Sequence, residues 1–259
     1  MFTPGLMPGS LLPVHDDNPT THFSFVTLLL IALNVLVFLV EPNLGQFREC
    51  QGEPTCEQGN LTTARFICRF GIVPTEITGQ KITEPALCSL GEVRSESKSI
   101  PWSALTSMFL HGGFQHLFGN MLFLWVFGNN IEDVLGKVRY VLFYLLAGLV
   151  ASAAHIFANA GSDIATIGAS GAVAGLLGAY IVLFPRARIT TLAFIFFFRI
   201  PAVVVLGLWF ASQFLIGRGQ QVGGGVAWMA HVGGFVAGAV LIFIFGGLKR
   251  RQQPARYTG

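Results

Sequence analysis

The chain has 259 residues, of which 53% are apolar and only 11% are charged. Soluble domains carry about 25% charged residues, so this composition excludes a disordered chain, a collagen-like fibre and an ordinary soluble enzyme. The net charge of +3, from 16 basic and 13 acidic residues, is too small to indicate a nucleic-acid partner.

Six long stretches of the chain contain no Asp, Glu, Lys or Arg: residues 18–40, 99–131, 140–162, 164–185, 200–217 and 219–248. Each reaches the ~18 residues that a helix needs to cross a bilayer core. Lipid offers no partners for unpaired backbone groups, so each span must be helical. A shorter stretch of ten residues, 189–198, is predicted to lie in the interface or against the bundle. The sequence therefore predicts an all-α polytopic membrane protein, with a six-helix bundle in residues 23–248.

The distribution of Lys and Arg predicts the orientation. If both termini are cytoplasmic, the short cytoplasmic loops and the tail, 249–259, hold nine basic residues: Lys137, Arg139, Arg186, Arg188, Arg199, Lys249, Arg250, Arg251 and Arg256. The short loops on the opposite side hold only Arg218. The positive-inside rule therefore favours two cytoplasmic termini. Residues 1–22 would form a cytoplasmic segment, and because they contain no Lys or Arg, no signal peptide is expected.

Residues 41–102 form the one sizeable polar segment and are predicted to be a long extracytoplasmic first loop. All four cysteines of the chain lie in this loop: Cys50, Cys56, Cys68 and Cys88. An oxidising compartment favours two disulfides with three possible pairings, and free thiols are the alternative. The spacings do not match the paired short intervals of a zinc site.

Polar side chains inside a bilayer are costly, so each one needs a partner or a function. The second span contains His111-Gly-Gly-Phe-Gln-His116-Leu-Phe-Gly-Asn120. His116 and Asn120 are four residues apart and share one helix face. His111 is expected to point elsewhere and to serve as a structural hydrogen-bonding residue. Two histidines could also bind a metal, but this segment has no acidic or thiol partner, so no metal is predicted.

The fourth span contains Gly168-Ala-Ser170-Gly171-Ala-Val-Ala-Gly175. Gly171 and Gly175 form a small-xxx-small face, which allows a neighbouring helix to approach closely. Gly168 and Gly171 leave space around Ser170 for a substrate carbonyl. Taken alone, Ser170 is explained more simply as a membrane serine that bonds to a backbone carbonyl.

The sixth span contains Ala230-His231-Val-Gly-Gly234-Phe-Val-Ala-Gly238. Gly234 and Gly238 give a second small face, and packing it against the fourth span would bring His231 close to Ser170. His116, Ser170 and His231 all fall in the outer parts of their spans. This shared depth favours a common site over three unrelated structural residues.

A serine hydroxyl becomes a useful nucleophile when an adjacent base takes its proton. His231 is the candidate base, and it could later protonate the leaving amine. No acidic residue falls within the spans at this depth, so the sequence predicts a Ser–His dyad. The Asn120 amide, the His116 ring and the Ser170 backbone N–H are the candidate donors to the oxyanion.

These three motifs, in this order, resemble those of the rhomboid family of intramembrane serine proteases. Gly128-x3-Glu132-x3-Gly136 resembles the family's element after the second helix. The matching segments extend over about residues 101–247, more than half of the chain. The resemblance implies Ser170 as nucleophile and His231 as general base.

The resemblance also implies His116 and Asn120 as oxyanion donors, and no cofactor. It implies a multi-pass protein of a bacterial plasma membrane, with a water-filled cavity open to the extracytoplasmic side. Substrates would be membrane proteins with an unstable transmembrane helix, cut near its outer end after a small residue. They would enter between the second and fifth helices, near Trp209 and Gln213, although lipid contact or packing also explains these two residues.

One position departs from the family pattern. Some members have a tyrosine four residues after the nucleophile, beneath the catalytic histidine, and here that position is Ala174. The residue that orients His231 is therefore not identified by the sequence.

Two other functions are alternatives. The first is a catalytically silent relative that binds membrane clients, but such proteins usually lack the serine or the histidine, and this chain keeps both. The second is a small transporter, which predicts polar groups through the bilayer depth and helices broken at the midplane. The polar residues found here cluster near the outer face instead.

Overall fold

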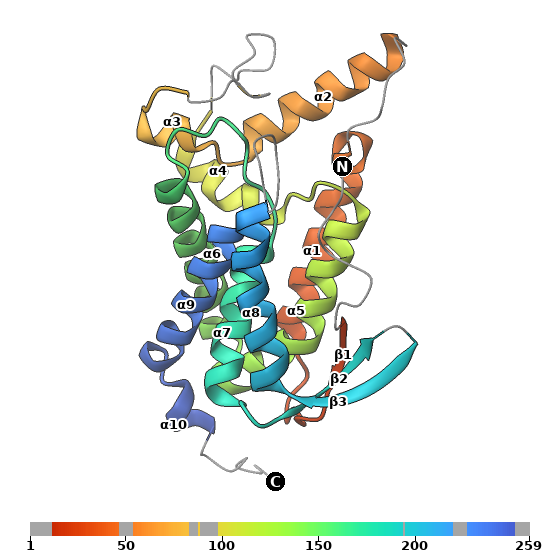
Figure 1. Ribbon diagram of the computed structural model, residues 1–259, viewed down its shortest axis with the longest axis vertical. Helices are drawn as coiled ribbons and strands as arrows, with labels where there is room; N and C mark the ends of the chain where they lie inside the picture. The colour runs from red at the N-terminus through yellow and green to blue at the C-terminus, as the bar shows by residue number, and fades with distance from the viewer. Residues whose placement is uncertain are drawn as a thin grey trace.

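The computed structural model describes residues 12–46, 54–82, 88, 98–193, 195–219 and 227–251. Its main feature is a bundle of helices, with further helices at one end and a small β-sheet at the other (Figure 1). The bundle helices are α1 (Phe25–Val40), α5 (Phe114–Leu135), α6 (Lys137–Ala158), α7 (Ser170–Leu183), α8 (Ala202–Gly219) and α9 (Trp228–Ile244). Each of the six uncharged stretches contributes one of these helices.

The second uncharged stretch is not a single helix. It begins with α4 (Ile100–Thr106) and a 3-10 turn, η3 (Ser107–Phe109), and α5 starts only at Phe114. The break occurs at Gly112 and Gly113, and Gly113 has a φ of 134°, which excludes it from a right-handed helix. The prediction that the second helix includes His111 is therefore wrong, because His111 lies in the loop before α5.

By length and composition, α6 is the one helix in the described ranges that is long and apolar enough to cross a membrane by itself. Shorter apolar helices are found at Phe25–Val40, Ser170–Leu183, Ala202–Leu215 and Trp228–Ile244. Six crossings therefore remain a prediction.

The core of the bundle surrounds α7, which packs against α5, α6 and α9, and α6 and α9 also pack against each other (Figure 1). Every α7 residue from Gly171 to Tyr180 is buried. The helix has no polar face, because neighbours cover it on all sides. A residue at either end of α7 is therefore held in place by the surrounding helices.

The all-α prediction is wrong in one respect, since the structure contains a three-stranded sheet. Its strands are β1 (Leu12–Asp16), β2 (Arg188–Ala193) and β3 (Phe196–Pro201), paired antiparallel in the order β1-β2-β3. Ile189 and Thr191 are fully buried while Arg188 is exposed, which is the period-two pattern of a half-buried strand. The ten-residue stretch 189–198 thus belongs to a hairpin that packs partly on the bundle.

The first strand is fixed to the bundle by a buried carboxylate. Asp16 Oδ2 accepts hydrogen bonds from the Tyr180 hydroxyl at 2.6 Å and from Asn130 Nδ2 at 2.8 Å. Next to it, the exposed Arg199 pairs with Asp17 across the sheet. Residues 12–17 of the predicted N-terminal segment are therefore part of the folded domain.

Glu132 connects the end of α5 to the start of α1. Its carboxylate accepts hydrogen bonds from the Val26 N–H at 2.9 Å, the Thr27 N–H at 2.7 Å and the Thr27 hydroxyl at 2.8 Å. The first N–H groups of a helix have no partner within the helix and favour negative charge. The buried acid of the Gly128-x3-Glu132-x3-Gly136 element thus caps a neighbouring helix.

The long loop between α1 and α4 contains a 3-10 turn, η1 (Pro42–Gly45), and the helices α2 (Pro54–Phe70) and α3 (Pro74–Thr78). Cys68, in the last turn of α2, forms a disulfide with Cys88. Cys56 is also disulfide-bonded, and Cys50 lies outside the described residues. Of the three possible pairings, the structure contains the one that joins Cys68 to Cys88. A short helix, α10 (Gly247–Arg251), follows α9.

Candidate active site

Ser170 and His231 lie in direct contact. Ser170 is the first residue of α7, and His231 is in the first turn of α9. The distance from His231 Nε2 to Ser170 Oγ is 2.8 Å, a normal hydrogen bond. The other ring nitrogen, Nδ1, lies 2.7 Å from Gln213 Oε1 on α8. Both nitrogens of the imidazole therefore have a partner, and the ring orientation is fixed.

Close packing of α7 against α9 places the two side chains together. A Cβ built on Gly234 would lie 2.1 Å from the Gly171 carbonyl oxygen, and one built on Gly238 would lie 1.8 Å from that of Gly175. Real Cβ atoms do not approach so closely, so only glycine permits this contact between the backbones. Gly178, which the sequence analysis did not single out, makes a similar approach to the carbonyl of Phe235.

His116 lies beside Ser170 with a space between them. His116 is in the first turn of α5, and its Nδ1 accepts a hydrogen bond from the Gly112 N–H at 3.3 Å. The ring proton is then on Nε2. A Cβ built on Gly168 would lie 2.8 Å from His116 Nε2 and 3.6 Å from Ser170 Oγ. The space that the missing side chain leaves is therefore adjacent to both the hydroxyl and a ring N–H.

Asn120 shares the α5 face with His116 as the spacing predicts, but its amide bonds within its own helix. Asn120 Nδ2 donates to the His116 carbonyl at 3.0 Å, and the residue is buried. The N–H of Ser170 is the first of α7, so it has no acceptor within the helix.

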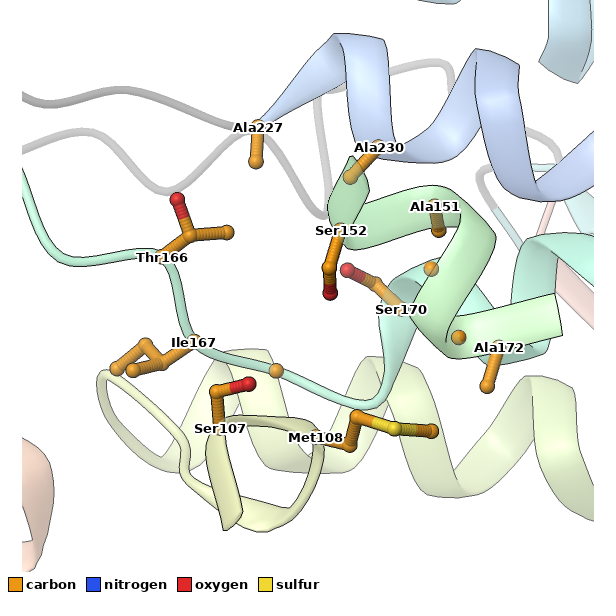
Figure 2. Close-up of a pocket in the computed structure, with 13 residues that line it drawn as sticks. Ser107, Met108, Ala151, Ser152, Thr166, Ile167, Ser170, Ala172, Ala227 and Ala230 are labelled. Atoms are coloured by element: carbon orange, nitrogen blue, oxygen red, sulfur yellow. The ribbon is translucent and has the colours of Figure 1, made fainter. Parts of the chain in front are cut away.

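A small pocket opens beside Ser170, and Figure 2 shows the Ser170 hydroxyl pointing into it. Most of its lining consists of Gly, Ala, Ser and Thr residues, including Ser107, Gly148 and Thr166, and Met108 and Ile167 are the two larger side chains. The Gly168 N–H donates to the Ser107 carbonyl at 2.8 Å, which holds the segment before α7 against η3.

His111 lies closer to the site than the sequence analysis expects. Its ring contacts the ring of His116 edge-on, with the centroids 5.1 Å apart. The expectation that His111 points elsewhere assumed a continuous helix, and it fails because the residue precedes α5. The backbone N–H of His111 donates to Glu41 Oε1 at 3.0 Å, so this loop is attached to the end of α1.

Glu41 is a buried carboxylate just beyond α1. Only 4% of its surface is exposed, and its one hydrogen bond in the described part of the chain comes from His111. Burial raises the pKa of Glu41 from 4.5 to about 7, and the bond from the His111 N–H opposes that rise. Between those pH values the folded protein retains a proton that the unfolded chain releases. The contribution of Glu41 to stability is therefore greatest below pH 4.5 and falls as the pH rises toward about 7.

Replacing Glu41 with glutamine is expected to remove this loss of stability. Glutamine keeps an oxygen for the His111 N–H but cannot ionise. The melting temperature of the variant minus that of the wild type should increase by several degrees between about pH 5 and pH 8. Each kcal/mol of unfolding free energy corresponds to ~2–4 °C in melting temperature. Thermal unfolding in detergent across this range measures the difference. A difference that stays constant with pH would contradict the assignment.

Gln213 and Trp209 are the site residues whose role the sequence did not identify. The resemblance associates both with a substrate gate, and lipid contact or packing is the alternative. Gln213 is only 3% exposed, so it does not face lipid. The Trp209 ring lies beside that of His231, with the centroids 5.9 Å apart. The one sequence signal that relates Trp209 to Gln213 is their spacing of four residues, which places them on the same face of a helix.

Comparison with known proteins adds independent support for the family. A family model described as the Rhomboid domain matches residues 98–248. The chain is 33% identical over 237 residues to RHOMBOID-like protein 2 of Arabidopsis thaliana, covering 88% of this chain and 69% of that protein. It is 36% identical over 218 residues to Rhomboid protease GluP of Bacillus subtilis (strain 168), covering 83% of this chain and 34% of that protein.

Several relatives are longer than this chain. The match to RHOMBOID-like protein 5 of Arabidopsis thaliana, 32% identical over 162 residues, covers 62% of this chain and 50% of that protein. The chain thus spans about half the length of this relative and about a third of GluP.

Proposed function

The chain belongs to the rhomboid family of membrane proteins, and on this basis we propose that it is an intramembrane serine endopeptidase with Ser170 as nucleophile and His231 as general base. The observation that carries the proposal is the 2.8 Å hydrogen bond between His231 Nε2 and Ser170 Oγ. The other ring nitrogen of His231, Nδ1, is already bonded to Gln213. A serine that only satisfied a backbone carbonyl would not need a histidine at this position.

The proposed reaction proceeds in two stages. Ser170 Oγ attacks the carbonyl carbon of the scissile peptide bond while its proton passes to His231 Nε2. The tetrahedral intermediate collapses when His231 returns the proton to the leaving amine, which leaves an ester on Ser170. Water, activated by the same histidine, then hydrolyses the ester.

The negative oxygen of the intermediate would occupy the space in front of Gly168. His116 Nε2 borders this space, the Ser170 N–H lies two residues after Gly168 at the start of α7, and the Asn120 amide lies one helical turn from His116. The N-terminus of α7 also favours negative charge there. Donors that are fixed before the reaction stabilise the charge without reorganisation.

The proposed substrates are membrane proteins with a transmembrane helix, cut after a small residue, since the pocket beside Ser170 is small and is lined mostly by Gly, Ala, Ser and Thr residues. We propose the orientation in which both termini are cytoplasmic and the site faces the extracytoplasmic side, with a bacterial plasma membrane as the location. The basic residues near the β-sheet and in the tail support the cytoplasmic assignment of that end.

The proposal is tested by labelling the purified protein in detergent with a fluorophosphonate, which reacts with activated serines. Labelling is expected in the wild type and should be lost in Ser170→Ala and in His231→Ala. Ser103 provides a matched control, because it is a buried serine whose hydroxyl bonds to the Ile100 carbonyl at 2.9 Å. Ser103→Ala should retain labelling.

Cleavage of a reporter with one transmembrane helix, reconstituted in liposomes, provides the second measurement. The wild type should cut it and Ser170→Ala should not. A folded wild type that neither labels nor cleaves would overturn the protease proposal and favour the client-binding alternative.

A further inference from the structure

The amide of Gln213 can adopt only one orientation. Its Nε2 lies 3.1 Å from the Trp209 carbonyl oxygen, which can only accept a hydrogen bond. A flipped amide would place two oxygens against each other, so the NH2 group must face Trp209. Ser212 Oγ gives this NH2 group a second neighbour at 3.2 Å, and it also donates to the Trp209 carbonyl at 2.6 Å.

The fixed amide determines the tautomer of His231. With its NH2 group toward Trp209, Gln213 presents Oε1 to His231 Nδ1 at 2.7 Å. An amide oxygen only accepts, so Nδ1 must carry the ring proton. Nε2 is then unprotonated and accepts the Ser170 hydroxyl proton at 2.8 Å. The Trp209 carbonyl, the Gln213 amide and the His231 ring therefore form a chain that ends at the nucleophile.

We infer that Gln213 is a positioning residue that holds His231 in the tautomer required of a general base; this inference rests on the proposed function. Gln213 would act as the third member of the site, in the place that a carboxylate takes in Ser–His–Asp enzymes. It would also supply the orientation that the position of Ala174 leaves open, together with the Trp209 ring beside His231.

A neutral amide suits this position better than a carboxylate. An isolated carboxylate is expensive to bury, whereas an amide loses little when its hydrogen bonds are satisfied. Gln213 is buried, and both ends of its amide have partners. The amide oxygen can also stabilise the imidazolium that forms when His231 takes the serine proton, because Nδ1 remains its donor throughout the reaction.

The tautomer is measured directly by NMR of the detergent-solubilised protein carrying 15N-labelled histidine. The His231 signals are identified by their loss in His231→Asn. The wild type should show a protonated Nδ1 and an unprotonated Nε2 near neutral pH, and Gln213→Leu should lose this bias. A wild-type ring protonated on Nε2 would overturn the inference whether or not the protein is active, and this result requires no variant of Gln213 to fold.

Kinetics of the variants separate positioning from general stability. Gln213→Leu is expected to lower kcat by about 100-fold, the scale of a lost contribution to general-base catalysis, with little change in KM. Gln213→Glu keeps an acceptor for Nδ1 but places its second oxygen against the Trp209 carbonyl, so its kcat should lie between those of the wild type and Gln213→Leu. Gln80→Leu makes the same chemical change at an exposed loop position and serves as the control. Unchanged kcat in a folded Gln213→Leu would overturn the inference.

The pH profile of kcat/KM gives a readout that a purely structural role would not change. A carboxylate at position 213 stabilises the imidazolium, so the acidic limb of the Gln213→Glu profile should move to higher pH. The other titratable groups facing His231 are His116 on α5 and His155 on α6, and both remain in each variant. An acidic limb at the same pH in Gln213→Glu and the wild type would contradict a contact between residue 213 and the His231 ring.

The two proposals fail in different ways. If wild-type labelling persists in Ser170→Ala, the protease proposal is wrong, whatever the tautomer of His231. If labelling depends on Ser170 while the ring is protonated on Nε2, the protease proposal stands and the role given to Gln213 is wrong.

Discussion

Replacing Gly168 with alanine is expected to reduce the rate of cleavage about 100- to 1,000-fold, which is the effect of losing one oxyanion donor. The new Cβ would lie 2.8 Å from His116 Nε2, in the space proposed for the substrate oxygen. The φ of Gly168 is +125°, which also strains any residue with a Cβ. The measurement is kcat/KM on a transmembrane reporter, together with the melting temperature.

Gly136→Ala is the control that distinguishes the effect of backbone strain from the effect of a Cβ that blocks the site. Gly136 also has a positive φ, 75°, and a Cβ there would have no neighbour within 4 Å. This variant should lose some stability and keep its kcat. If Gly168→Ala cleaves as fast as Gly136→Ala, the space in front of Gly168 does not hold the reacting carbonyl.

Replacing Gly238 with alanine is expected to lower the free energy of unfolding by more than about 3 kcal/mol, the upper part of the range for overpacking a core. The added carbon would lie 1.8 Å from the Gly175 carbonyl oxygen, so α9 would have to move away from α7. His231 is on the same helix, two turns earlier. Activity should therefore fall with stability, and thermal unfolding and fluorophosphonate labelling measure the two effects.

Gly207→Ala is the matched control on α8. A Cβ at Gly207 has no neighbour within 4 Å, so alanine there should be neutral or stabilising by up to about 1 kcal/mol. A loss of stability in Gly207→Ala equal to that in Gly238→Ala would show that the contact between α7 and α9 is not the cause.

The sequence was sufficient to predict the long helices and the contact between Ser170 and His231. The helices follow from uncharged stretches, a signal that needs no knowledge of tertiary contacts. The contact follows from two faces of small residues, Gly171 with Gly175 and Gly234 with Gly238, whose close approach aligns the first turns of α7 and α9. Both signals can be recognised within single segments of the sequence.

Features that depend on distant parts of the chain could not be predicted in this way. The strand β1 is stabilised by β2, which lies far along the sequence, and by Asp16 bonded to Tyr180. The link from Gln213 to His231 depends on the rotation of α8 about its axis. An uncharged helix gives little sequence information about that rotation, because no polar face distinguishes lipid from protein.

The sheet has a consequence for how the chain is threaded through the membrane. Because β1 and β2 are hydrogen-bonded, both must lie on the same side of the bilayer. If the bundle helices cross the bilayer as proposed, the chain crosses an even number of times between the two strands, and α1, α5, α6 and α7 are the four bundle helices in that interval. Residues 12–17 contain no Lys or Arg to determine their own side. They lie beside Arg188 and Arg199 of the hairpin, so in the proposed topology the basic residues of a segment made much later in synthesis determine the side on which the first strand lies.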